Sequence, residues 1–317
     1  MSTTRFRTAA LTLAAAMAAT VFTSSCGVSH EPSGNGKGRQ PVTRAMPLPD
    51  AEIRATWPKE QVERGLAKGM RLPLEDYMPG YPDVVDAENA RDLVRQACMQ
   101  RLNFKFTPEP SGLRPAASYD AMNMKRRYGI TDRTEAALHG FALPQAGTED
   151  DSTSEEDAEL AREDSESSVP GWDEAMNNTC IPEANAKVGV LFETDLAGDL
   201  ASESYAATAR QTPVRSALAT WSSCMAGHGH RVKSLDDAEG RSATSKPSGL
   251  EPGRAEVSMA TNDVDCKQAG RLVETWFKAE AAYQHQQIAA HRHELDAEKA
   301  RNRKLSERTR AVLAVRK

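Results

Sequence analysis

The feature that most constrains the fold of this 317-residue chain is a short pattern that occurs twice around a cysteine. Cys98 and Cys224 are each followed by methionine, and each ends a stripe of apolar residues at helical spacing. Five residues after each cysteine stands Asn103 or Gly229, two residue types that tolerate a left-handed backbone. A basic and then an apolar residue follow. The pattern therefore predicts two helices that each end in a sharp stop and continue as an extended segment.

Each copy of this pattern has a second cysteine farther along the chain, in another segment of helical character. Cys180 follows the first copy, and Cys266 follows the second. The simplest pairing is within each copy, Cys98 with Cys180 and Cys224 with Cys266, although four cysteines allow three pairings and the sequence does not exclude the other two. A metal site built from these cysteines is disfavoured because no Cys-x-x-Cys pair is present. Two disulfides would suit a chain with a thin apolar core, since only 5% of its residues are aromatic.

The rest of the chain favours an all-α fold. Apolar residues recur at helical spacing over 83–102 and 212–227, and no segment alternates β-branched residues in the manner of a strand. Asp132 with Glu135 three residues later forms a capping-box pattern at the start of a short helix. We therefore expect a duplicated, disulfide-stapled helical body over residues 47–290.

The C-terminal region predicts one long helix. After Arg254 the chain has no proline and a single glycine, Gly270, and residues with high helix propensity dominate. The 52 residues from Cys266 to Lys317 would span about 78 Å as one helix, so we expect the far end, 291–317, to project from the body as a basic tail. The candidate interaction residues in this tail are Arg292, Lys299, Arg301, Arg303, Lys304, Arg308 and Arg310.

This basic tail has several possible partners. Residues 291–317 carry nine Lys or Arg against four acidic residues, which suits anionic lipid headgroups or wall polymers. It is also compatible with a solvated helix end, with a coiled coil, or with a contact to acidic residues 149–168 of the same molecule. Those residues hold ten acidic side chains and one arginine, so we expect an exposed, disordered insert or a cation-binding or docking arm. Nucleic acid is disfavoured because the chain carries a net charge of −5.

The N-terminus has the pattern of a bacterial lipoprotein signal over residues 1–25. A basic start precedes an apolar run, Ala9–Phe22, that is too short to span a membrane, and small residues lead into Cys26. We expect cleavage before Cys26, lipid on its sulfur, and a mature protein anchored to the outer face of the cell membrane. The alternative is an ordinary secretory signal cut just before this cysteine. Residues 26–46 are expected to be a flexible tether, because glycine, serine and proline are frequent there.

Motifs for catalysis and cofactors are not found. The chain has no Gly-x-Ser-x-Gly, His-Glu-x-x-His, Gly-x-x-x-x-Gly-Lys or EF-hand pattern. His228 and His230 stand two residues apart, but the first copy has Leu102 and Phe104 at these positions. We therefore predict surface or packing histidines, no metal site and no cofactor. The histidines of the C-terminal helix are not expected to bind a metal ion either. The aromatic residues of this helix are expected to lie in the core. These residues are His285, His291, His293, Trp276, Phe277 and Tyr283, together with Trp221 of the second copy.

The chain resembles a family of uncharacterised actinobacterial secreted lipoproteins over most of its length beyond the tether. The matching segments are Arg71–Tyr77, Cys98–Met99, Arg126–Asp132, Trp221–Met225, Asp265–Lys267 and Trp276–Gln287. The resemblance implies an envelope location and the duplicated Cys-Met pattern, and it transfers no catalytic residue.

These observations favour a non-enzymatic, lipid-anchored envelope protein that acts as an adapter or interaction module. The alternative is a solute-binding or accessory subunit of a membrane transporter, which would have a buried pocket between the two Cys-Met copies. An enzyme acting on wall material is a weaker third hypothesis.

Overall fold

A computed structural model of the chain describes residues 46–114, 122–142, 161–243 and 252–315. Over these ranges the regular structure is helical, and the only β-pairing is an isolated bridge between Arg127 and Gly129. The fold is therefore all-α, as the sequence predicts. No helix in these ranges combines the length and the apolar character that a membrane span requires. Cys26 lies outside the described residues.

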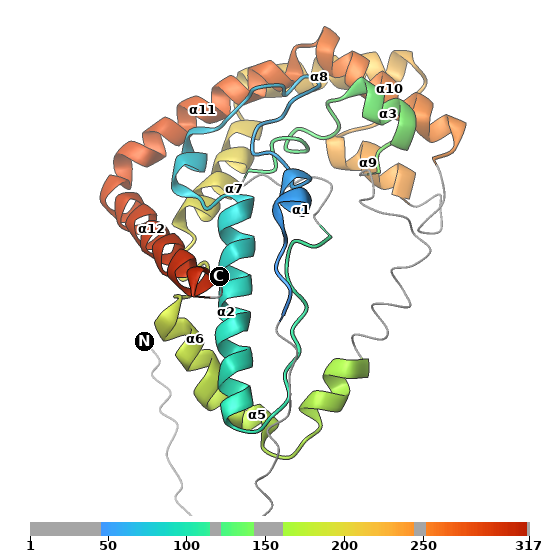
Figure 1. The fold of residues 1–317 in the computed structure, drawn as a ribbon. Helices are drawn as coiled ribbons and strands as arrows, with labels where there is room; N and C mark the ends of the chain where they lie inside the picture. The colour runs from blue at the N-terminus through green and yellow to red at the C-terminus, as the bar shows by residue number, and fades with distance from the viewer. Residues whose placement is uncertain (1–45, 115–121, 143–160, 244–251, 316–317) are drawn as a thin grey trace, which may run out of the picture. The chain divides into compact units, whose positions relative to one another are not determined.

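Figure 1 shows the order and the arrangement of the elements. In chain order they are α1 (Ala51–Ala55), η1 (Pro73–Tyr77), α2 (Tyr81–Arg101), α3 (Arg133–His139), α5 (Trp172–Ala175), η2 (Met176–Cys180), α6 (Ile181–Lys187), α7 (Leu196–Ala209), α8 (Thr212–Gly227), α9 (Leu235–Ala243), α10 (Arg254–Ala269), α11 (Leu272–Ala290) and α12 (Arg292–Ala314).

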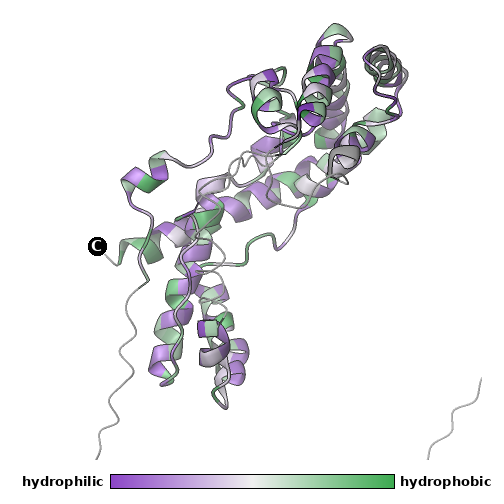
Figure 2. Cartoon of the chain, turned by 90° about the vertical axis from the view of Figure 1, so that its right-hand side faces the viewer, coloured by the Kyte–Doolittle hydropathy of each residue, from purple (hydrophilic) through white to green (hydrophobic). Residues whose placement is uncertain are grey.

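The main core forms where α7, α8, α10 and α11 pack together, with α3 against α10. Trp221, Tyr128 and Leu272 are among its fully buried side chains. The α2 helix leads away from this core, and α6 and α12 pack along it (Figure 1). Hydrophilic residues occur along every helix, and no helix is apolar throughout (Figure 2). The longer helices therefore combine buried apolar residues with exposed polar ones, which is consistent with a polar chain.

The short helix α3 shows how local sequence sets an element. The Asp132 carboxylate accepts hydrogen bonds from the backbone N–H groups of Thr134 and Glu135, at 2.7 and 3.2 Å. These bonds satisfy donors that the first helical turn leaves free, so Asp132 is the N-cap. Gly140, with φ of 60°, ends the helix. The predicted start of this helix at Asp132 is confirmed.

Both Cys-Met segments end their helix with the same backbone turn. In each, the N–H of the sixth residue after the cysteine donates to the methionine carbonyl, at 2.9 Å in both copies. The residue before this donor is left-handed, Asn103 with φ of 64° and Gly229 with φ of 86°. These are the features of a Schellman turn, which ends a helix and satisfies its last carbonyls. The predicted helix, stop and exit are confirmed.

A side-chain hydrogen bond repeats in the two copies as well. The Gln96 amide, two residues before the first cysteine, donates to the Phe106 carbonyl at 3.3 Å. The Ser222 hydroxyl, two residues before the second cysteine, donates to the Val232 carbonyl at 2.7 Å. Both carbonyls belong to the eighth residue after the cysteine. The duplication is thus a repeat of structure, in which the exit segment is tied back to its helix.

Both predicted disulfides are present. Cys98 pairs with Cys180, and Cys224 pairs with Cys266, with Cα–Cα distances of 5.5 and 5.6 Å. The first bond joins α2 to η2, and the second joins α8 to α10. Each disulfide therefore links the helix of a Cys-Met turn to one later helix.

The structure corrects the prediction of one long, projecting C-terminal helix. A left-handed residue, Arg271 with φ of 49°, separates α10 from α11, and His291 marks the bend between α11 and α12. The bend directs α12 back along η1, α2 and α7 (Figure 1). It also buries Leu295 completely and leaves only 3% of Glu298 exposed. Residues 292–314 therefore belong to the folded body.

The acidic stretch also differs in part from its prediction. Residues 149–160 lie outside the described ranges, but residues 161–167 form a helix. Glu166 in this helix is buried and accepts hydrogen bonds from the backbone N–H and hydroxyl of Thr107, at 2.8 and 2.9 Å. Its carboxylate also lies 3.1 Å from the Lys105 ammonium. The C-terminal end of the stretch is thus held by one buried acid that the exit segment of the first Cys-Met turn satisfies.

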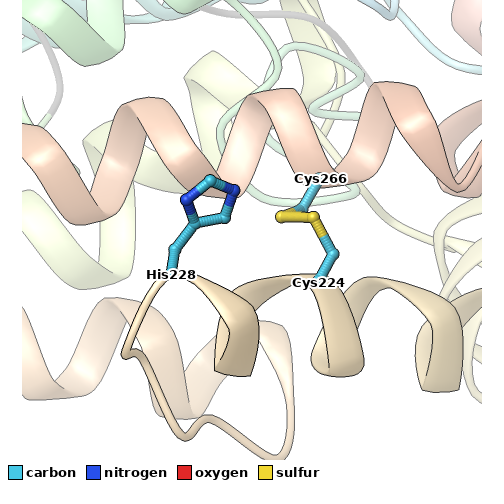
Figure 3. A group of neighbouring side chains, drawn as sticks. All are labelled: Cys224, His228 and Cys266. Atoms are coloured by element: carbon cyan, nitrogen blue, oxygen red, sulfur yellow. A yellow bond between two sulfur atoms is a disulfide. The ribbon is translucent and has the colours of Figure 1, made fainter.

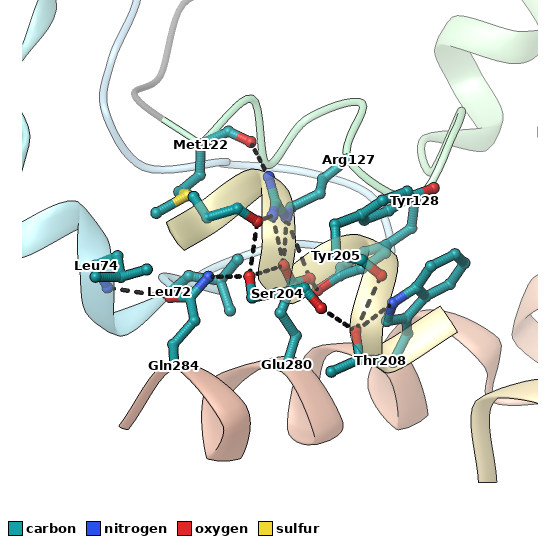
Figure 4. A network of polar contacts seen from close by, with 12 residues as sticks. Leu72, Leu74, Met122, Arg127, Tyr128, Ser204, Tyr205, Thr208, Glu280 and Gln284 are labelled. Atoms are coloured by element: carbon teal, nitrogen blue, oxygen red, sulfur yellow. Dashed lines mark hydrogen bonds and ion pairs between the residues drawn. The ribbon is translucent and has the colours of Figure 1, made fainter. Parts of the chain in front are cut away.

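A buried ionic network fixes α11 in the main core (Figure 4). Glu280 is fully buried and pairs with the Arg127 guanidinium, and the hydroxyls of Tyr128 and Ser204 each donate to it at 2.8 Å. Gln284, one turn later, accepts from the Leu74 backbone N–H at 3.1 Å. Burial raises the pKa of Tyr128, and the Glu280 charge adds to the effect. The Glu280 carboxylate is satisfied by three partners, so we assign the network to stability.

Candidate functional site

The seven candidate basic residues of the C-terminal helix are all exposed. By helical position they fall on two sides of the buried stripe that contains Leu295 and Glu298. One side carries Arg301, Lys304 and Arg308, which we call the basic edge. The other side carries Arg292, Lys299, Arg303 and Arg310. In the sequence these residues form one basic segment, whereas in the structure they lie on two sides of α12.

The basic edge lines a pocket of about 190 Å³ together with part of residues 188–194, the connection between α6 and α7, which contributes Val188, Gly189, Val190, Glu193 and Thr194. Three cations and one acidic residue, Glu193, are among the lining residues. Within the described part of the chain, none of the three cations forms an ion pair. The pocket is therefore electropositive and open to an anion from solution.

A buried acid on α12 sets the position of this pocket. The Glu298 carboxylate accepts hydrogen bonds from the backbone N–H groups of Leu196 and Ala197, at 2.9 and 3.1 Å. It caps the first turn of α7, where the helix dipole favours negative charge. Glu298 also accepts from the Thr194 hydroxyl at 2.9 Å, and that hydroxyl in turn accepts from Arg301. One carboxylate thus fixes α12, the start of α7 and the connecting segment together.

A glycine allows the close approach of this connection to α12. Gly189 has φ of 117°, and a Cβ atom there would lie 3.4 Å from the Leu305 side chain. The segment then carries its apolar residues outward, because Val190 is 41% and Phe192 is 51% exposed. Phe192 also has a left-handed backbone, with φ of 53°, which is uncommon for an aromatic residue. Exposed apolar side chains therefore stand beside a basic pocket.

The second side of α12 has a different electrostatic environment. Lys299 and Arg303 line a hollow of about 480 Å³ that also contains Asp76, Asp83 and Asp296. The Lys299 ammonium lies 5.2 Å from the centre of the Tyr77 ring. Arg303 lies 3.7 Å from Glu307 one turn later. Acidic groups therefore partly compensate these cations, and this side is a weaker anion site.

A further pocket of about 300 Å³ lies between residues 55–64 and the 125–135 segment. Its charges neutralise one another, because Lys59 pairs with Glu63 at 2.6 Å and Lys125 pairs with Glu135 at 2.8 Å. Arg64 approaches Glu135 to 3.9 Å. Neither Cys-Met turn contributes to its lining. This pocket does not match the one that the transporter hypothesis expects between the two copies.

The predicted histidines separate in the structure. The His230 ring lies 3.2 Å from the Asn262 amide, so it contacts a neighbouring helix. His228 is exposed and lies beside the second disulfide. On the C-terminal helices, His285 and His293 are exposed and His291 occupies the bend. Sequence reasoning considered His228 with His230, whereas the structure places His228 near two sulfur atoms.

The aromatic residues of the second copy and of α11 are mostly core, as predicted. Trp221 is fully buried, and Trp276 is 3% exposed and stacks on Tyr205 with ring centres 4.6 Å apart. Phe277 is partly buried against the core. Tyr283 differs, because its hydroxyl reaches the surface and donates to Glu203 at 2.8 Å.

Comparison with protein families, with curated proteins and with solved structures finds no match to this chain.

Proposed function

We propose that this chain is a non-enzymatic, lipid-anchored protein of the cell envelope that acts as an adapter and binds anionic phospholipid headgroups through the basic edge of α12. The anchor rests on the signal pattern of residues 1–25 and on Cys26 at its end. Two disulfides support an extracytoplasmic location, because such bonds persist in oxidising compartments.

The observation that carries the headgroup proposal is the combination of charge and apolar exposure at one place. Arg301, Lys304 and Arg308 line a pocket together with the exposed Val190, and the exposed Phe192 lies two residues farther along the same connection. A phosphate group would meet guanidinium and ammonium donors in the pocket, which bind such anions strongly. The exposed apolar side chains would meet the acyl region below the headgroups.

These apolar side chains favour a membrane over a wall polymer as the source of the anion. A soluble polyanion would gain contacts with the three cations and none of comparable strength with Phe192. A bilayer offers both environments at the spacing of a headgroup and an acyl chain. Binding to a membrane should therefore depend on Phe192, whereas binding to a soluble polyanion should not.

Vesicle binding tests the proposal. Residues 27–317, which contain every described residue and lack Cys26, would be mixed with phosphatidylglycerol vesicles and with phosphatidylcholine vesicles in sedimentation assays. We expect binding to the anionic vesicles only, and weaker binding as salt rises. Replacing Arg301, Lys304 and Arg308 with Gln should lower the affinity about a hundredfold, since each basic residue near an anionic surface contributes about 1 kcal/mol.

The matched control is the double variant Lys299→Gln and Arg303→Gln, which removes charge from the opposite side of the same helix. We expect it to retain most of the binding, and Phe192→Ser to weaken binding to vesicles. An equal loss in the control and in the basic-edge variant would contradict the proposal. Binding to an anionic wall polymer that is independent of Phe192 would assign the site to the wall.

The anchor has its own test. Cells grown with labelled palmitate should label the wild-type chain and not the Cys26→Ala variant. Release of the unlabelled variant from the membrane fraction would support anchoring through this sulfur, and retention of label in the variant would contradict it.

A further inference from the structure

The second disulfide has a third potential metal ligand beside it. The Sγ atoms of Cys224 and Cys266 and a ring nitrogen of His228 lie within 4.8 Å of one another. Figure 3 shows the imidazole rising from the end of α8 on the same side as the disulfide, facing α10. Cys266 is fully buried, Cys224 is partly exposed and His228 is exposed. This cluster is therefore open to solvent on its histidine side.

The Cys-Met turn places this histidine. His228 is four residues after Cys224, so both side chains share one face of α8. The backbone N–H of His228 donates to the Cys224 carbonyl at 3.2 Å, and the left-handed Gly229 follows. The imidazole is thus attached to a fixed backbone at the helix end.

The first copy lacks a corresponding third group. Cys98 and Cys180 are both fully buried, in a small cluster with Met99, Trp172 and Met176. The residue four positions after the first cysteine is Leu102. The same turn therefore presents a non-ligand side chain in one copy and an imidazole in the other.

We propose that Cys224, Cys266 and His228 form a redox-gated Cys₂His site for Zn²⁺ that is open when this disulfide is reduced. A dithiol reductant transfers two electrons and two protons to the disulfide, which becomes two cysteine thiols while the reductant becomes its own disulfide. Zn²⁺ then binds two thiolates and the neutral imidazole, and the two thiol protons are released to solvent. A disulfide oxidant then accepts two electrons from the two thiolates and two protons from solvent and becomes a dithiol, while the Cys224–Cys266 bond re-forms and the ion is released.

The geometry suits a tetrahedral ion. Zinc binds thiolate sulfur at about 2.3 Å and histidine nitrogen at about 2.0 Å, so the ligand atoms of a tetrahedral site lie about 3.5 to 3.8 Å apart. The three ligand atoms already lie within 4.8 Å of one another on two helices whose cysteine Cα atoms are 5.6 Å apart. Because His228 is exposed, water can take the fourth position. Three protein ligands and one open position are the arrangement of reactive zinc sites rather than of closed structural ones.

Zinc titration of the full chain in two redox states tests this proposal. The purified chain would be titrated with zinc chloride before and after reduction by a phosphine, which becomes its oxide, against a chromophoric chelator. We expect one equivalent to bind only after reduction. Cobalt(II) chloride should then give thiolate charge-transfer absorption, which reports sulfur ligation directly.

The variants make the test specific to this cluster. His228→Leu, which copies the first turn and leaves both disulfides intact in the oxidised state, should lower zinc affinity at least tenfold. His230→Leu should leave the affinity unchanged. Cys98→Ala with Cys180→Ala should still bind one equivalent, and Cys224→Ser with Cys266→Ser should bind none.

Three results would overturn the proposal. The first is reduced wild-type chain that binds no zinc, the second is His228→Leu with unchanged affinity, and the third is loss of binding when only the first pair of cysteines is removed. Far-UV circular dichroism of the oxidised His228→Leu variant establishes that it is folded before the titration.

Discussion

The two Cys-Met copies have the same turn and different surroundings. Each ends its helix with a left-handed residue and a hydrogen bond to the methionine carbonyl, and each is joined by a disulfide to a later helix. The first disulfide is sealed in a small apolar cluster of its own, which includes Trp172 and Met176. The second lies at the edge of the main core, with Cys224 partly exposed and His228 beside it.

The same backbone turn therefore occurs beside a disulfide that holds the fold in one copy and beside a disulfide that can open in the other. In the first copy the junction of α2 with η2 and α6 lies outside the main core and depends on two small buried clusters, so we infer that the disulfide is a main constraint there. In the second copy the junction of α8 and α10 has additional support. Trp221 donates to the Asp263 carboxylate at 2.7 Å, and Lys267 pairs with the same carboxylate at 2.6 Å. We infer that the second disulfide can open without loss of the fold.

We expect the largest loss of unfolding free energy when either disulfide is removed, and the two losses can be compared. The bonds close segments with sequence separations of 82 and 42 residues. The chain-entropy model then gives about 4.5 kcal/mol for the first and about 4 kcal/mol for the second. Urea unfolding of Cys98→Ala with Cys180→Ala and of Cys224→Ala with Cys266→Ala would measure both losses.

Amide hydrogen exchange sharpens this comparison. The first pair of substitutions should remove protection from α5, η2 and α6 before the main core opens, because these helices pack in small clusters outside that core. The second pair should leave α8 and α10 protected. Uniform loss of amide protection in the first variant would contradict the proposed difference between the two copies.

We expect the next largest loss of unfolding free energy from substitution of Lys267, because its buried ion pair stabilises the second copy. Its ammonium is 1% exposed and donates to Asp263 and to the Ile130 carbonyl. Lys267→Met leaves the buried carboxylate with the Trp221 N–H alone, which we expect to cost about 3 kcal/mol of unfolding free energy. The matched substitution in the first copy is Arg95→Met, in a half-buried pair with Asp92, at about 1 kcal/mol. Equal costs would contradict the proposed role of the Lys267 network.

Alkaline pH should weaken the core around the second copy. Burial, aided by the Asp236 charge, raises the pKa of Tyr205 from its ordinary value of about 10 to about 12. The folded state then keeps a proton that the unfolded state loses, so this stability is complete below pH 10 and is lost as pH rises toward 12. The Tyr205→Phe variant keeps the stack on Trp276 and should show a shallower fall of the urea midpoint over this range. An unchanged slope would exclude Tyr205 as a source of the alkaline dependence.

The smallest expected effects test the shared turn itself. A Cβ atom at Gly229 would meet nothing within 4 Å, so Gly229→Ala should cost only the left-handed backbone penalty, about 1 kcal/mol. Asn103→Gly should stabilise the first turn by a few tenths of a kcal/mol. Thermal unfolding of the two variants would show whether the first is destabilised and the second stabilised. A stabilising Gly229→Ala would show that the two turns are not equivalent.

Local features of the fold were predictable from sequence because they depend on neighbouring residues. The Cys-Met turns need a residue that accepts positive φ at one position, and Asn103 and Gly229 are such residues. The Asp132 cap also acts within three residues, on Thr134 and Glu135. The disulfide pairs were one of three possibilities, and the structure selects the within-copy one.

Features that depend on distant residues could not be predicted. Helix propensity indicates a continuous C-terminal helix, whereas the bend at His291 follows from burial of Leu295 and from the Glu298 cap on α7, about 100 residues away in sequence. The pairing of Glu280 with Arg127 spans 153 residues in the same way. The basic edge also needed the structure, because residues 188–194 give no sequence signal for a pocket beside α12.

Differential reduction of the two disulfides tests whether the second disulfide opens more easily than the first. The full chain would be equilibrated in a series of dithiothreitol redox buffers, trapped with isotope-coded iodoacetamide, and analysed by peptide mass spectrometry. We expect Cys224 and Cys266 to become labelled under more oxidising conditions than Cys98 and Cys180, while α8 and α10 keep their amide protection. Reduction of Cys98 and Cys180 first, or reduction of both pairs at one potential, would contradict this expectation.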